Sequence, residues 1–201
     1  GEIVCLLNND IEVTNSGWLL ELVSQVTRDN VGAAGALLRY PDGSLQHAGL
    51  SPNLGGLFGH AHKYFPLGHF GYRNRLATVH RVAAVTGACL VTSRDLWMEL
   101  EGLNESFAVA YNDVDFCLRV RQAGYNVVWT PFAELIHHES LSRGYDEHPK
   151  EGDRLSREVN LLTALWGDFL GNDPAYSPNL TSEDTNFSLS DQPRISPIWK
   201  K

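Results

Sequence analysis

The sequence predicts an α/β domain in which helices flank a sheet. Short apolar runs typical of buried strands alternate along the chain with amphipathic segments of helical period. Turn signals rich in Gly, Pro, Asn and Asp separate these segments. A length of 201 residues suits one domain, or one domain with a tail.

The first third of the chain supplies three strands and a helix. Residues 3–7 form a continuous apolar run, the pattern of a central parallel strand that is covered on both faces. Apolar residues at helical spacing predict a helix over 17–27. Strands are expected over 31–40 and 45–50, separated by a Pro-Asp-Gly turn.

Residues 51–74 have a different character. This stretch is rich in Gly, His, Phe and Tyr and follows neither the helical nor the strand period. We expect a long mobile loop, because segments of this kind in compact domains are either functional lids or disordered.

The second half predicts further alternation. A strand interrupted at Gly87 spans 82–92, and Ser93 is placed to cap the helix that follows. A second helix is expected over 113–123. The sequence "NVVWTPFAELIHH" predicts a strand pair, and a last amphipathic helix covers 158–170.

The predicted domain comprises residues 1–171. Beyond it, residues 172–201 are polar and rich in Pro, Ser and Asn, which predicts an extended or disordered tail.

Charge, hydropathy and cysteine content argue against several classes of protein. A net charge of −8 argues against non-specific binding of nucleic acid. No apolar run reaches the roughly 20 residues that cross a bilayer, so no transmembrane segment is predicted. The three cysteines have no CxxC spacing, which indicates buried free thiols in a reducing compartment and hence a cytoplasmic protein.

Three small clusters could carry chemistry. Asp10 follows a strand and is flanked by two amides, so it suits either a Mg²⁺ ligand or a simple turn. Asp113 lies at a helix start and is either a cap or a base. His137 and His138 follow a strand and are either metal ligands or structural residues.

A fourth pair is assigned to structure. Asp115 and Arg119 are four residues apart on the predicted helix over 113–123, a spacing that suits a salt bridge.

The order of these clusters carries a resemblance. "LLNNDIEV", "VTGACLVTSRDLW", "GLNESFAVAYNDVDFCLRVRQAGY" and "PFAELIHHESLSRG" resemble the consecutive motifs of family-2 glycosyltransferases of the GT-A fold, and most closely the rhamnosyltransferase-like members. The likeness spans roughly residues 2–145. It implies a partial GT-A, Rossmann-like mixed sheet flanked by helices and a role in polysaccharide biosynthesis for the cell envelope.

The resemblance implies a role for each cluster. The family's DXD motif matches residues 8–10, so Asp10 is the implied ligand of Mg²⁺ or Mn²⁺, and Asn8 replaces the first carboxylate. His137 matches a metal-binding histidine. Asp113 matches the catalytic base, although Asn112 stands where family members often have Glu.

The remaining predicted contacts are to substrates. Asn8, Asn9 and Arg143 are expected to bind the donor, and Gly87, Ala88 and Asn112 the acceptor. The donor is a nucleotide-diphosphate sugar, and the acceptor is a glycan or a lipid-linked molecule. Direct displacement with one base predicts inversion at the anomeric carbon. A lipid-linked acceptor would place the protein at the inner face of the membrane.

Compared with the family pattern, the N-terminal nucleotide-binding units are missing from this sequence. We therefore expect the chain alone to bind donor poorly and to turn over slowly or not at all. Two alternatives stay open, a catalytically silent relative that binds sugars or partners, and a phosphate-processing hydrolase on a similar sheet.

Overall fold

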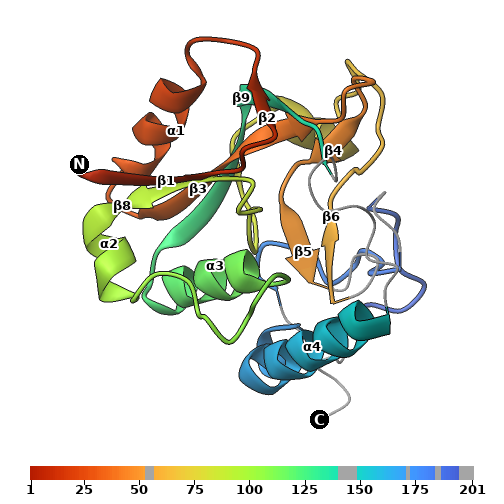
Figure 1. Ribbon diagram of the computed structural model, residues 1–201. Coiled ribbons are helices and arrows are strands. Elements are labelled where there is room, and N and C mark those ends of the chain that lie inside the picture. Colours follow the sequence, from red (N-terminus) through yellow and green to blue (C-terminus); the bar gives the residue numbers. More distant parts are fainter. Residues whose placement is uncertain (53–56, 140–148, 171–172, 184–186, 195–201) are drawn as a thin grey trace.

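The computed structural model describes residues 1–52, 57–139, 149–170, 173–183 and 187–194. Within these residues the chain forms a mixed sheet flanked by helices (Figure 1). The α/β class predicted from the sequence is therefore confirmed.

The main sheet combines strands from both halves of the chain. Its principal order is β1-β8-β3-β9-β2, with β4 paired to β3 and β7 paired to β9. The bounds are Ile3–Leu7 (β1), Ile11–Val13 (β2), Val31–Arg39 (β3), Leu45–His47 (β4), His80–Arg81 (β7), Cys89–Ser93 (β8) and Asn126–His137 (β9). Among these pairs only β3 and β9 run parallel.

The strand Ile3–Leu7 has the predicted bounds, but the prediction that it is a central parallel strand was wrong. Within the described sheet, β1 lies at one end of the strand order and is antiparallel to β8. Leu7 is 44% exposed, and Cys5 is exposed although Cys89 and Cys117 are buried as predicted. An apolar run indicates a strand, but it does not specify which strands lie beside it.

The predicted strand pair near the end of the domain is one strand of 12 residues, β9. Pro131 lies inside β9, and a proline lacks the backbone N–H that a continuous ladder needs. Instead, the pairing with β3 shifts register, from Gly35 opposite Trp129 to Leu37 opposite Glu134, and the intervening residues bulge around the proline.

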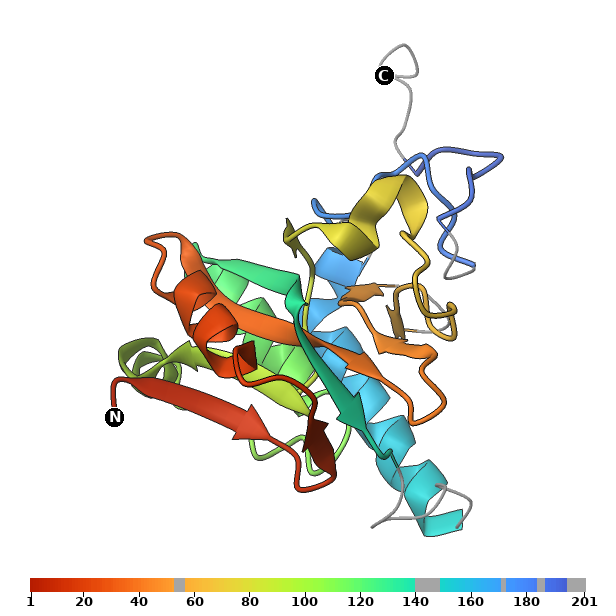
Figure 2. The same cartoon turned by 90° about the horizontal axis from the view of Figure 1, so that it is seen from above.

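In the part of the chain that the structure describes, four α-helices flank this sheet. They are α1 (Trp18–Val26), α2 (Arg94–Glu99), α3 (Asn112–Gln122) and α4 (Pro149–Leu170). In Figure 2, which looks down from above, α1 lies in front of the sheet and α3 and α4 lie behind it. Ser93 caps α2 as predicted, because its hydroxyl accepts a hydrogen bond from the Leu96 N–H.

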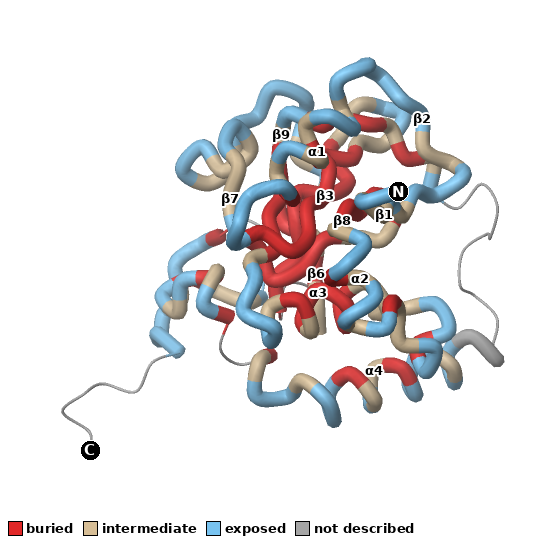
Figure 3. The backbone as a smooth tube through the Cα atoms, turned by 90° about the vertical axis from the view of Figure 1, so that its left-hand side faces the viewer, coloured by how far each residue is buried: buried red, intermediate tan, exposed pale blue. Residues whose placement is uncertain are grey.

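Alternation along β3 supplies a core on each face of the sheet. Ala33 and Leu37 face the core that contains Phe116 of α3, and Ala34 and Leu38 face the core that contains Leu22 of α1. Buried residues accordingly concentrate along the central strands (Figure 3).

The described residues of the stretch 51–74, which are 51–52 and 57–74, are more ordered than predicted. Leu50–Pro52 (β5) pairs with Phe58–His60 (β6), and a 3₁₀ segment covers Tyr72–Ala77. His62 is 1% exposed and stacks on Phe187 from the segment predicted as a tail, with ring centroids 4.5 Å apart. His62 and Phe187 thus pack two distant parts of the chain against each other.

The described part of 172–201 has one isolated bridge, between Leu180 and Leu189, and no helix or strand. It nevertheless packs against the domain, since Tyr176, Leu180 and Phe187 are buried in a cluster with Ala61. None of the helices in the described ranges is long and apolar enough to cross a bilayer.

Candidate functional site

Strand pairing brings the first and third predicted clusters, Asp10 and His137, together. Residues 8–10 form the turn between β1 and β2, and β2 pairs antiparallel with the end of β9, so that Ile11 lies opposite His137. The His138 N–H donates to the carbonyl oxygen of Asp10 at 3.0 Å. Backbone pairing therefore fixes Asp10 beside His137, 127 residues away in sequence.

Only one of the two histidines faces Asp10. The Nε2 atom of His137 lies 3.1 Å from Oδ1 of Asp10 and 3.3 Å from Nδ2 of Asn8. His138 is directed instead to Glu12, with 2.9 Å between Nε2 and Oε2. Asn9 is exposed at the same turn. The geometry thus favours His137 over its neighbour.

The pair of Asp10 and His137 fits a divalent cation. Two ligands in neighbouring positions of an octahedral ion, each at about 2.1 Å, lie roughly 3 Å apart. Their side chains are 14% and 11% exposed, so an ion between them remains reachable from solvent. Within the described part of the chain, no group of three or more His, Cys, Asp or Glu side chains is placed to hold an ion. Water and phosphate oxygens would supply the other ligands.

Asp113 occupies the first turn of α3. Its Oδ2 accepts from the Gly87 N–H at 2.7 Å, and its Oδ1 accepts from the Val114 N–H at 2.8 Å. Burial raises the pKa of Asp113 above its ordinary value, and these two N–H groups act in the opposite direction. The result is a partly buried carboxylate with an increased affinity for a proton.

A three-residue segment, 86–88, connects this carboxylate to the turn over 8–10. The Gly87 N–H binds Asp113, and the carbonyl oxygen of Ala88 accepts from the Asn8 N–H at 3.0 Å. A Cβ atom at Gly87 would lie 3.4 Å from Cβ of Asp113, at the limit of ordinary van der Waals contact, so the backbone here runs directly against that side chain. The base candidate and the metal candidate therefore share one support.

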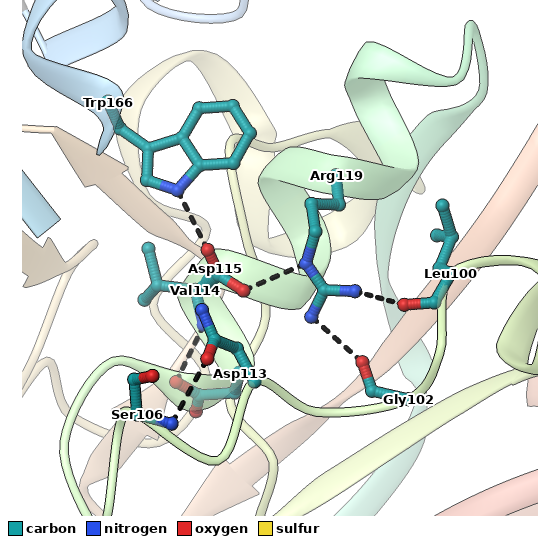
Figure 4. A network of polar contacts seen from close by, with 9 residues as sticks. Leu100, Gly102, Ser106, Asp113, Val114, Asp115, Arg119 and Trp166 are labelled. Carbon is teal, nitrogen blue, oxygen red and sulfur yellow. Dashed lines mark hydrogen bonds and ion pairs between the residues drawn. The ribbon is translucent and has the colours of Figure 1, made fainter.

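A buried network holds α3 in place (Figure 4). Asp115 is 1% exposed; its Oδ2 lies 2.8 Å from Nε of Arg119, and its Oδ1 accepts from the Trp166 indole N–H of α4. Arg119 also donates to the carbonyl oxygens of Leu100 and Gly102. The predicted salt bridge between Asp115 and Arg119 is confirmed, and it anchors the turn that carries Asp113.

The structure places most of the predicted site residues in one region. Asp10 and Asn8 each contact His137, and Gly87 and Ala88 join this group to Asp113. Asn112 begins α3 beside Asp113. Arg143 lies outside the described residues.

Sequence reasoning missed two further polar residues, Gln46 and His47. They are 3% and 0% exposed and contact His137 and the Thr86 N–H, respectively. The sequence did offer a signal, since these two polar residues lie in a stretch predicted as a strand. Polar side chains buried in a strand require hydrogen-bond partners, which would have indicated a polar site nearby.

Comparisons with known proteins show which family this chain resembles. The family model described as "Glycosyl transferase family group 2" matches residues 24–158. The chain is 49% identical over 200 residues to the uncharacterized protein y4gI of Sinorhizobium fredii, covering 99% of this chain and 22% of that protein. It is 39% identical over 203 residues to the O-antigen biosynthesis protein RfbC of Myxococcus xanthus, covering 96% of this chain and 15% of that protein.

A third relative is the N-acetylglucosaminyl-diphospho-decaprenol L-rhamnosyltransferase of Mycobacterium tuberculosis, which is 35% identical over 141 residues. That match covers 64% of this chain and 43% of that protein. The chain thus spans less than half the length of each of these three relatives.

Two solved structures share the fold. GalNAc-T7 with UDP, GalNAc and Mn²⁺ matches with a TM-score of 0.59 and 17% identity, over 84% of this chain and 32% of that chain. The mannosyltransferase PcManGT of Pyrobaculum calidifontis with GDP-Man and Mn²⁺ matches with a TM-score of 0.50 and 17% identity, over 87% of this chain and 41% of that chain. By fold, by the matched family model and by its relatives, this chain belongs to the family-2 glycosyltransferases of the GT-A fold.

Proposed function

We propose that this chain carries the catalytic centre of an inverting glycosyltransferase. It would move a sugar from a nucleotide-diphosphate sugar to an acceptor hydroxyl. The observation that carries the proposal is the shared support of the segment 86–88, which binds Asp113 on one side and the turn of Asp10 on the other. A base and a metal pair are thereby held in one site.

Asp113 suits the role of general base. The acceptor hydroxyl must lose its proton as it attacks the anomeric carbon, and a carboxylate with a raised proton affinity promotes this transfer. Attack from the face opposite the leaving group, assisted by one base, inverts the configuration at that carbon.

Asp10 and His137 suit the role of metal ligands. They would hold Mg²⁺ or Mn²⁺, which when bound offsets the charge that develops on the departing diphosphate. The support for this assignment is the 3.1 Å separation of their ligand atoms and the Mn²⁺ present in both structural neighbours.

The proposed substrate contacts are those that the resemblance to the family implies. Asn8, Asn9 and Arg143 are assigned to the donor, and Gly87, Ala88 and Asn112 to the acceptor. The relatives' names favour a glycan or lipid-linked acceptor, since one includes a diphospho-decaprenol and another O-antigen biosynthesis. Such an acceptor fits a cytoplasmic protein at the inner face of the membrane.

Replacing Asp113 by Asn tests the proposal. We expect transfer by the full-length protein to fall by about 10²–10⁴-fold, because the hydroxyl loses its base while the amide keeps the shape of the side chain. Transfer is measured with a panel of nucleotide sugars and an acceptor alcohol, and the anomeric configuration of the product by NMR. Donor affinity, measured by calorimetry, should stay within threefold.

Asp168→Asn, an exposed residue of α4, is the matched control. A wild-type rate in Asp113→Asn would refute the assignment of the base. Donor binding without transfer in the wild-type protein would favour the catalytically silent alternative. Release of free sugar at one rate with and without acceptor would favour a hydrolase.

A further inference from the structure

We propose that Gln46 and His47, neighbours on β4, are positioning residues for the two halves of the site. Gln46 would orient His137 toward the cation, and His47 would fix the segment 86–88 that holds Asp113. This inference rests on the proposed function and adds two residues to it.

The strand geometry allows two adjacent residues to act on separate targets. β4 pairs with β3 and lies beside the end of β9 (Figure 1). Successive side chains of a strand point to opposite faces. Gln46 accordingly reaches His137 of β9, while His47 reaches Thr86. Both side chains are buried, so each must satisfy its polar atoms within the protein.

The contacts of Gln46 determine its orientation. Its Nε2 lies 3.4 Å from the carbonyl oxygen of His137 and 3.3 Å from Oε2 of Glu139, and both of these atoms only accept hydrogen bonds. The amide oxygen Oε1 must therefore face Nδ1 of His137, at 2.7 Å. Since Oε1 is also an acceptor, Nδ1 of His137 carries a proton.

This orientation prepares His137 to bind a cation. In the neutral ring with a proton on Nδ1, Nε2 presents its lone pair to Asp10 and accepts from the Asn8 amide. A lone pair and a carboxylate oxygen 3.1 Å apart repel each other unless a proton or a cation lies between them. A buried acceptor on the other ring nitrogen of a ligand histidine raises its metal affinity.

His47 acts on the opposite half of the site. Its Nε2 accepts from the Thr86 N–H at 3.4 Å, so its proton is on Nδ1, which donates to Nδ1 of His60 at 3.0 Å. Burial lowers the pKa of His47 well below its ordinary value, with a smaller effect of His60, so the ring stays neutral and keeps this tautomer.

The segment that His47 holds contacts Asp113 directly. The Thr86 hydroxyl and the Gly87 N–H both bind the Asp113 carboxylate, and the Thr86 hydroxyl also accepts from the Ala88 N–H. Fixing the Thr86 peptide therefore fixes two of the groups that stabilise the charged form of the base.

Two single variants of the full-length protein separate these roles. Gln46→Met removes the acceptor for His137, and we expect the Mn²⁺ dissociation constant, measured by electron paramagnetic resonance, to rise about 10–100-fold. Transfer should recover as Mn²⁺ is increased. His47→Met removes the acceptor for the Thr86 N–H. Transfer should then fall about tenfold at every Mn²⁺ concentration, with a Mn²⁺ dissociation constant within twofold of the wild-type value.

NMR provides a readout that does not depend on activity. In ¹⁵N–¹H spectra, His137 should lose its single Nδ1–H tautomer in Gln46→Met, and the Gly87 amide proton should shift upfield in His47→Met. His47→Gln places an amide oxygen near the position of Nε2, and we expect it to restore both the Gly87 shift and transfer. The exposed residues Gln122 and His69, each replaced by Met, are matched controls.

The outcomes distinguish this inference from the proposed function. The inference is overturned if both variants change metal affinity and transfer together, or if neither changes its own readout in a protein with wild-type melting temperature. If the wild-type protein transfers no sugar, the proposed function fails, and the Mn²⁺ and NMR measurements still decide the roles of Gln46 and His47.

Discussion

Asp113 shows how two opposing effects set the chemistry of a single residue. Burial disfavours its charged form, whereas the N–H groups of Gly87 and Val114 and the hydroxyl of Thr86 favour that form. Burial is the larger effect, so the pKa of Asp113 lies above the 3.8 of an ordinary aspartate. The residue accepts a proton readily and still has two N–H donors to stabilise it when charged.

This balance predicts the acidic limb of the rate profile. Because the base must be deprotonated, kcat should fall on acidification with an apparent pKa above 3.8. Steady-state transfer measured at saturating donor and metal from pH 4 to 8 checks this. The limb should disappear from the residual rate of Asp113→Asn, and an unchanged limb in that variant would assign the titration to another group.

At the scale of elements, α3 is held from two sides. Asp115 binds Arg119 on the same helix and Trp166 on α4, and Arg119 binds the carbonyl oxygens of Leu100 and Gly102 (Figure 4). The helix that carries the proposed base is therefore tied to α4 and to the loop after α2. Its position depends on this buried ion pair.

Asp115→Ala should lower the free energy of unfolding by about 3 kcal/mol, because it leaves a largely buried guanidinium without its carboxylate. Urea denaturation followed by circular dichroism measures the loss. Asp168→Ala, on the exposed face of α4, should change it by less than about 0.5 kcal/mol. Equal effects of the two variants would show that the network contributes little.

The same scale shows what the sequence could and could not predict. The helix of Asp113 was predictable because the residues that favour it are close together in sequence, and so was the salt bridge between residues four apart. The neighbours of β1 were not, because strand pairing joins residues far apart in sequence, as in Ile3 opposite Ser93. Gln46 and His47 escaped notice for the same reason, since their partners come from β9 and the segment 86–88.

Over the whole molecule, buried histidines make stability depend on pH. Burial is the largest cause that lowers the pKa of His60 to about 4, of His62 to about 3 and of His80 to about 4, from an ordinary value of 6.5. The unfolded chain therefore binds protons at a pH where the folded chain does not. Their contribution to stability is complete above pH 6.5 and is lost as the pH falls toward 4 and below.

We expect the urea midpoint of the wild-type protein to fall steadily between pH 6.5 and 4. Each histidine that titrates only when unfolded contributes a slope of about 1.4 kcal/mol per pH unit. His62→Phe retains a ring to stack on Phe187 and should give a shallower slope. Parallel slopes for the variant and the wild-type protein would exclude His62 as a source of the acid sensitivity.

The hydrogen bond between the Asn8 N–H and the Ala88 carbonyl oxygen has a thermodynamic consequence. It joins the turn over 8–10, which would receive the cation, to the segment 86–88, which stabilises the charged form of Asp113. Binding of the cation and protonation of Asp113 are therefore coupled, with one free energy of coupling between them. Such coupling is reciprocal: if the cation lowers the proton affinity of Asp113, deprotonation of Asp113 strengthens cation binding by the same factor.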